Sequence, residues 1–137
     1  MNVAIPTLGC LWNDVLHFSL MHPSVIYKNL MDAGINYSER EVVWFEVPLQ
    51  DVLQYPTTLY LNTTKGWQDD KIMPSSDFEP VTAARVGELS GMPAVNLEYY
   101  RESFAKGERP LLWKRAPHVL VKGDLDISGY KTFDWRE

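Results

Sequence analysis

The sequence is poor in the residues that build covalent cross-links, metal centres and membrane spans. It contains a single cysteine, Cys10, among 137 residues, which excludes an internal disulfide and a multi-cysteine metal site. No neighbour in the sequence would activate its thiol, so we expect Cys10 to act as a small apolar side chain. The longest apolar runs are far below the roughly 18 residues of a spanning helix, and the N-terminus lacks the pattern of a signal peptide. We therefore expect a soluble, cytoplasmic protein with no membrane association.

Motifs that bind nucleotides or metal ions are also absent. There is no Walker loop, no GxGxxG and no GxSxG, so the common nucleotide-binding and hydrolase folds are unsupported. The sequence has neither HExxH nor paired CxxC, and its three histidines are scattered. No metal site is predicted.

Positive charge is scarce in the first part of the chain. The formal net charge is −5, which argues against nonspecific binding to DNA or another nucleic-acid backbone. Residues 1–80 carry four Lys and Arg against ten Asp and Glu, whereas residues 81–137 carry nine against eight. An ordinary solvated surface explains this difference. The alternative is a local basic face for a phosphate-bearing ligand, built from some of Arg85, Arg101, Arg109, Lys114, Arg115 and Lys122.

Apolar residues are plentiful enough to build one core. The composition is 45% hydrophobic and 12% aromatic, and a chain of this length usually forms one domain, here residues 1–137. Strand-like and helix-like segments do not alternate regularly. We therefore predict a single compact α+β domain with a split mixed or antiparallel sheet and about three short helices, rather than a doubly wound sheet.

The most regular stretch predicts a strand followed by a helix. In the strand over 15–20, alternation sends His17 and Ser19 to the same side. Pro23 suits the first turn of the helix, and Gly34 supplies its left-handed end. This unit therefore presents a histidine and a serine from one face of a sheet.

The remaining elements are shorter. One further helix is expected over 81–89, and another begins with Asn96 as its N-cap and ends at Gly107. The segment 67–80 is predicted to be a long loop with a short extended piece at 71–73. Five further strands are expected over 41–47, 57–63, 110–113, 117–122 and 130–135.

Two histidines in predicted strands are the best candidates for chemistry. A sheet could present His17 and His118, together with Ser19, toward a cleft; the alternative is that each is hydrogen-bonded at the rim of the core. Exposed aromatic rings could stack on a base or a nicotinamide, although aromatic residues also fill cores. The candidates are Trp12, Trp44, Trp67, Tyr99 and Trp113.

Both ends of the chain resemble the ADP-ribosyltransferase-like fold, in particular its DarT-type branch. The resemblance covers an H-x-S strand, a helix ending in glycine and an apolar residue, a following strand, and a late strand with a turn. In this sequence these are His17-Phe18-Ser19, the helix to Gly34-Ile35, Val42-Val43-Trp44-Phe45 and the stretch 118–128. The middle of the chain is unmatched.

This resemblance implies NAD binding in the cleft of a split sheet and action on a protein or nucleic-acid acceptor. His17 would grip the nicotinamide-side ribose with help from Ser19, and we also assign Trp44 and Tyr60 to NAD binding. The family's catalytic glutamate falls at His118. Because a neutral imidazole cannot supply the charge of a carboxylate, the chemistry differs, the alignment is displaced, or the domain binds without catalysing.

A second resemblance is to the 2H phosphoesterases. Their two H-x-T/S motifs face each other across a cleft and act as general base and acid on a cyclic or 2′–5′ phosphodiester. His17-Phe18-Ser19 matches the first motif and His118-Val119 begins the second, with Leu120 in place of the second hydroxyl residue. A non-catalytic protein-binding or inhibitory domain is the third hypothesis. Both enzymatic hypotheses require His17 and His118 to lie close together.

Overall fold

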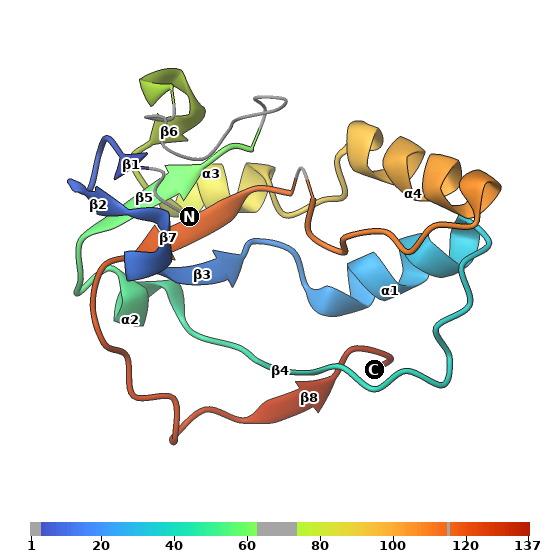
Figure 1. Ribbon diagram of the computed structural model, residues 1–137. Coiled ribbons are helices and arrows are strands. Elements are labelled where there is room, and N and C mark those ends of the chain that lie inside the picture. The colour runs from blue at the N-terminus through green and yellow to red at the C-terminus, as the bar shows by residue number, and fades with distance from the viewer. Residues whose placement is uncertain (1–3, 63–73, 115) are drawn as a thin grey trace.

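The fold is α+β, as predicted. The computed structural model describes residues 4–62, 74–114 and 116–137, and within them it contains four α-helices and three antiparallel sheets (Figure 1). The predicted extended piece at 71–73 and the candidate Trp67 lie outside the described residues.

The main sheet joins strands from both ends and the middle of the chain. Its order is β3-β7-β5-β6, and every pair of neighbours is antiparallel. The late strand β7 therefore lies between the early strand β3 and the middle strand β5. The bounds are β3 Leu16–Ser19, β5 Thr57–Tyr60, β6 Phe78–Glu79 and β7 His118–Val121.

Each face of this sheet packs on a different apolar cluster, because alternate side chains of β7 point in opposite directions. Leu120 belongs to a cluster with Tyr60 and Phe78, which the N-terminal segment covers. Val119 and Val121 belong to the other cluster, which lies toward α2. The predicted opposition of these β7 residues is thus confirmed. The covering elements are β1 Ala4–Ile5, β2 Cys10–Leu11, the 3-10 helix η1 Trp12–Asp14 and, on the other face, α2 Leu49–Val52.

A third cluster holds the two longest helices against the C-terminal segment. Figure 1 shows α1 and α4 side by side at one end of the molecule, and the short sheet of β4 and β8 apart from the main sheet. Trp135, which follows β8, is fully buried in this cluster together with Leu30 and Tyr100. The bounds are α1 Pro23–Asp32, α4 Ala94–Lys106, β4 Val43–Phe45 and β8 Thr132–Asp134.

The helices are short. The longest that the structure describes, α4, has 13 residues, and none of the described helices has the length and apolar character needed to cross a membrane. The remaining elements are α3 Ala83–Glu88 and the 3-10 helix η2 Ser75–Asp77.

Helix α1 begins and ends where the sequence predicts. Pro23 is its first residue, where a missing N–H costs no helical hydrogen bond. At the other end Gly34 has φ +95°, its N–H donates to the carbonyl of Met31, and the N–H of Ile35 donates to that of Leu30. These are the paired hydrogen bonds of a Schellman motif.

The region around α4 departs from the prediction. The helix begins at Ala94 rather than after Asn96, so Asn96 is not its N-cap. Asn96 is instead fully buried, and its amide donates to the Tyr100 hydroxyl over 3.2 Å. A polar side chain that is buried away from water needs a hydrogen-bond partner within the protein. The predicted strand at 110–113 is also absent from the described structure. The backbone of this segment forms hydrogen bonds with α4 side chains instead; for example, the N–H of Leu111 donates to the Tyr99 hydroxyl over 2.8 Å.

Candidate functional site

The register of β7 brings four candidate side chains to one face of the main sheet. His118 lies directly opposite Ser19 on β3 and Tyr60 on β5, while His17 lies opposite Leu120. Residues that face each other across antiparallel strands point to the same side. The ring centroids of His17 and His118 are 6.2 Å apart, and those of Tyr60 and His118 are 6.4 Å apart. His118 therefore lies between His17 and Tyr60, and the predicted proximity of the two histidines is observed.

Trp12 adds a fourth ring to this group. Its ring centroid is 4.6 Å from that of His17 and 5.3 Å from that of Tyr60. Its carbonyl oxygen lies 3.3 Å from Nε2 of His17. Because η1 runs directly into β3, the backbone that carries Trp12 is fixed beside the histidine strand. We call Trp12, His17, Tyr60 and His118 the histidine cluster.

Asn62 ties the cluster to the segment before β7 and was not predicted as a site residue. Its Oδ1 accepts a hydrogen bond from the Tyr60 hydroxyl over 3.1 Å, and its amide donates to the carbonyl of Ala116 over 3.0 Å. Its φ of +58° is one that asparagine tolerates better than most residues. The sequence around Asn62 does not indicate this role, because the carbonyl that it bonds belongs to the distant residue Ala116.

Both histidines of the cluster are biased toward the neutral form. Burial, helped by the nearby charge of His17, lowers the pKa of His118 to about 4. Partial burial also lowers the pKa of His17, although its hydrogen bond to the Trp12 carbonyl opposes this. The Nδ1 atom of His118 is buried and has no hydrogen-bond partner in the described structure. At neutral pH the site therefore offers uncharged imidazoles, one of which has an unsatisfied nitrogen.

Ser19 shares the face, but its hydroxyl is used locally. It donates to the carbonyl of Met21 over 3.0 Å and accepts from the N–H of the same residue over 3.1 Å. These bonds hold the turn between β3 and α1. Ser19 therefore fixes the exit of the histidine strand, and contact with a ligand would require its hydroxyl to share these bonds.

Trp44, the remaining candidate for NAD binding, lies in another part of the fold. It belongs to β4 in the two-stranded sheet, with its ring centroid 4.3 Å from His22 and 4.9 Å from Phe133. Strand pairing does not bring Trp44 to the face that carries His17 and Tyr60.

The described neighbourhood of the cluster holds no paired carboxylate. Within residues 4–62, 74–114 and 116–137, neither His17 nor His118 forms an ion pair with Asp or Glu. The same residues contain no group of three or more His, Cys, Asp or Glu side chains placed to hold a metal ion. The chemistry available from these residues is proton acceptance by imidazole, hydrogen bonding and stacking on aromatic rings.

No family model matches this chain, and neither a curated protein nor a solved structure matches it. The histidine cluster is therefore the feature of this chain that bears most directly on its function.

Proposed function

We propose that this protein is ADP-ribosyltransferase-like, binding NAD at the histidine cluster and acting on a macromolecular acceptor. The observation that carries the proposal is the position of β7, which sets His118 between His17 and Tyr60 on one face. The residues of the H-x-S resemblance thus share a face with the residue at the position of the family's glutamate.

The residues present are suited to the nicotinamide end of NAD. The half-buried ring of Trp12 is of the kind that packs against planar heterocycles, whereas Tyr60 is fully buried. Buried polar atoms are normally hydrogen-bonded, so the unpartnered Nδ1 of His118 would gain a partner from a ribose hydroxyl or an amide of the ligand. Trp12 would supply the stacking surface and the two histidines the polar contacts, while the buried Tyr60 would hold the Trp12 ring in place from the core.

The neutral state of His118 favours binding of NAD but limits the rate of transfer. With a pKa of about 4, the imidazole is neutral at physiological pH and does not repel the positively charged nicotinamide ring. It can also accept a proton from an acceptor hydroxyl or amine. It cannot supply the negative charge of a carboxylate, so we expect transfer to be slow and to depend strongly on the acceptor.

The test is NAD binding followed by nicotinamide release. NAD should raise the melting temperature in a saturable way, and nicotinamide should be released when an acceptor is present. His17→Ala should abolish both effects. His22→Gln removes an exposed imidazole from another part of the fold and should leave both intact, at a small cost in helix capping. If NAD leaves the melting temperature unchanged up to millimolar concentration, the proposal is wrong.

The distance between the two imidazoles favours a second candidate, a 2H-type phosphodiesterase acting on cyclic or 2′–5′ linked nucleotides. Rings 6.2 Å apart on adjoining strands are close enough to serve one substrate as general base and general acid. Both pKa values are lowered in the free protein, but a bound phosphodiester anion would raise them toward neutrality. Leu120, at the position of the second hydroxyl residue, is buried in the core and cannot replace it.

This second candidate makes a different demand on the two histidines. Hydrolysis of a 2′,3′-cyclic nucleotide should occur without NAD and should be lost equally in His17→Ala and His118→Ala. An active His118→Ala variant would rule out the paired-histidine mechanism while leaving NAD binding open.

A further inference from the structure

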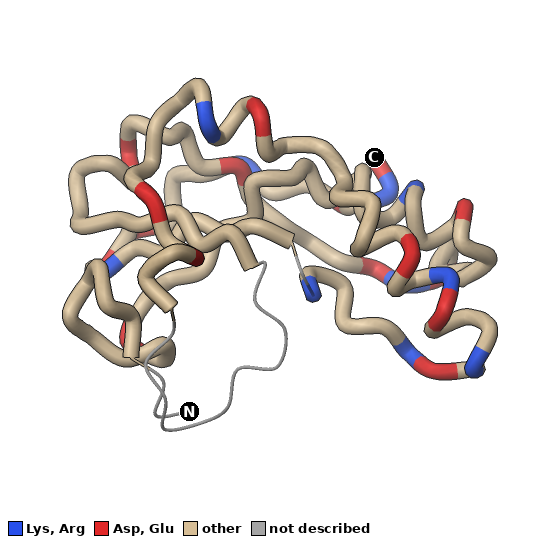
Figure 2. Tube along the Cα trace, turned by 90° about the horizontal axis from the view of Figure 1, so that it is seen from above, with Lys and Arg blue, Asp and Glu red and all other residues tan. Residues whose placement is uncertain are grey.

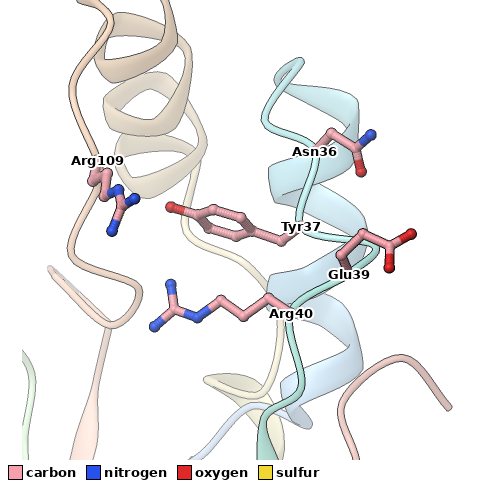
Figure 3. A pocket seen from close by; sticks show the side chains of 5 residues that line it. All are labelled: Asn36, Tyr37, Glu39, Arg40 and Arg109. Atoms are coloured by element: carbon pink, nitrogen blue, oxygen red, sulfur yellow. The ribbon is translucent and has the colours of Figure 1, made fainter.

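A hollow of about 310 Å³ lies in a part of the fold that the histidine cluster does not use. It is formed by the loop between α1 and β4 and by the segment that follows α4 (Figure 3). No residue of the histidine cluster lines it. The lining residues are Asn36, Tyr37, Glu39, Arg40 and Arg109.

Two guanidinium groups enter this hollow without a carboxylate partner. Figure 3 shows the side chains of Arg40 and Arg109 reaching into the same space beside the Tyr37 ring, whereas Asn36 and Glu39 point away from it. The ion pairs among the described residues use Arg85 and Arg136, and neither arginine of the hollow. Two guanidinium groups against one carboxylate, that of Glu39, leave the hollow with a local excess of positive charge.

The loop that carries Arg40 is held in place by the C-terminal segment. The Tyr37 ring stacks on Trp135 with centroids 6.1 Å apart, and Trp135 is fully buried. Nε1 of Trp135 donates to the carbonyl of Arg40 over 2.8 Å, and Nη1 of Arg136 donates to the carbonyl of Ser38 over 2.9 Å. The backbone beneath the guanidinium is thus fixed before any ligand arrives, which lowers the entropy cost of binding.

The backbone on the Arg109 side is fixed by the end of α4. Gly107, with φ +68°, closes the helix, and the N–H of Leu111 donates to the Tyr99 hydroxyl over 2.8 Å. Arg109 lies between these two anchors and its side chain is exposed. The hollow therefore combines two anchored backbones with two long cationic side chains.

Tyr37 limits what the hollow can recognise. The Arg40 guanidinium lies over the Tyr37 ring at 5.1 Å from its centroid, and Trp135 stacks on the same ring. Stacking contacts with Arg40 and Trp135 thus already use the ring, so its part is to orient Arg40 rather than to hold a base. The recognised group is therefore the anion itself.

We propose that this hollow is a binding site for a phosphoryl group, with Arg40 and Arg109 as its donors. A guanidinium presents paired N–H donors whose spacing matches two oxygens of a phosphate, and two such groups can hold one phosphoryl group from both sides. Figure 2 shows Asp and Glu interspersed with Lys and Arg at the α4 end of a molecule whose net charge is −5, so the positive charge here is confined to the two guanidinium groups. This positive charge is local, which suits one bound anion better than a long nucleic-acid backbone.

The experiment titrates inorganic phosphate into the protein at constant ionic strength and follows binding by calorimetry. The native protein should bind phosphate in a saturable way, and Arg40→Gln and Arg109→Gln should each weaken binding about tenfold or more. Arg109 is exposed, so its replacement should leave the fold intact. Arg101→Gln, which removes an exposed arginine of α4 outside the hollow, should bind as the native protein does.

Comparing the binding of inorganic phosphate, AMP and adenosine distinguishes a free phosphate ligand from a nucleotide. Adenosine should not bind. Tighter binding of AMP than of phosphate indicates that a nucleotide carries the phosphoryl group, and equal binding indicates a free anion. Saturable binding of adenosine would show that the hollow recognises the base and would overturn the proposal. Absence of saturable binding of both phosphate and AMP, or unchanged affinity in Arg109→Gln, overturns the proposal. The site is independent of the proposed NAD site, so His17→Ala should retain phosphate binding, and each proposal can fail without the other.

Discussion

His118 is an imidazole that its surroundings keep uncharged. Burial lowers its pKa to about 4, against about 6.5 for an unfolded histidine. Between these values the unfolded chain takes up a proton that the folded protein does not. The contribution of His118 to stability is therefore complete above about pH 6.5 and decreases as the pH falls toward 4.

The first prediction concerns this dependence on pH. From pH 7 to pH 4 the native protein should lose about 3 kcal/mol of unfolding free energy through His118, as its shift in pKa requires. His118→Gln should lose correspondingly less over the same range, as measured by urea unfolding at several pH values. Identical curves for His118→Gln and the native protein would show that His118 is not held neutral.

The second prediction concerns the buried hydroxyl of Tyr100. It donates to the carbonyl of Leu112 and accepts from the amide of Asn96. Tyr100→Phe removes this partner from the Leu112 carbonyl and from the fully buried Asn96 amide, at a cost of about 1–3 kcal/mol. The matched control is Tyr27→Phe, whose hydroxyl has no hydrogen bond in the described structure and whose change should be within about 0.5 kcal/mol. Urea unfolding of the two variants checks the difference.

At the scale of elements, the two long helices end in glycines that differ in their surroundings. Gly34 and Gly107 both have positive φ, at +95° and +68°. A Cβ atom on Gly107 would meet nothing within 4 Å, whereas one on Gly34 would lie 3.0 Å from the ring of Phe104. The glycine at the end of α1 therefore packs closely against α4, whereas the glycine at the end of α4 faces open space.

The third prediction follows from this contrast. Gly107→Ala should cost about 1 kcal/mol, because only the left-handed backbone is strained. Gly34→Ala should cost more, and replacing Phe104 by Ala in the same chain should recover the excess. The measurement is a double-mutant cycle by urea unfolding. Equal costs for the two glycines, with no coupling to Phe104, would show that the ring gives way freely.

At the scale of the whole molecule, Trp135 links the C-terminal segment to the helices and to the loop before β4. It is fully buried among α1 and α4 residues, its N–H donates to the carbonyl of Val42, and its indole donates to Arg40. Because Tyr37 stacks on the same indole, the proposed phosphoryl site depends on this packing.

The fourth prediction is that Trp135→Ala destabilises the protein by roughly 3–5 kcal/mol, the usual cost of a large core cavity. Trp135→Phe keeps most of the packing and loses the bond to the Arg40 carbonyl, so about 1–3 kcal/mol is expected. Thermal unfolding followed by circular dichroism compares the two variants. Trp135→Phe should also weaken phosphate binding, since the loop that carries Arg40 loses an anchor. Unchanged stability in Trp135→Ala would show that the packing of this residue does not stabilise the fold.

The local features of the fold could be predicted from the sequence because they depend on near neighbours. Alternation in β3 and β7 put His17 with Ser19 and separated His118 from Val119, and the strand register agrees. The glycine end of α1 followed in the same way. Asn96 was misplaced because its sequence neighbours suggest a helix start, whereas its real partner, Tyr100, is decided by burial.

By itself the sequence determined the α+β class, the faces of the strands and the glycine C-terminal ends of the two long helices, since each follows from side-chain periodicity or from one residue's backbone preference. Only the tertiary structure decided that β7 lies between β3 and β5, because strand order is set by packing both faces of the sheet. That order brings His17, Tyr60 and His118 together from three distant segments. The closeness of Arg40 and Arg109 has the same cause, since the core that Trp135 completes packs α1 against α4.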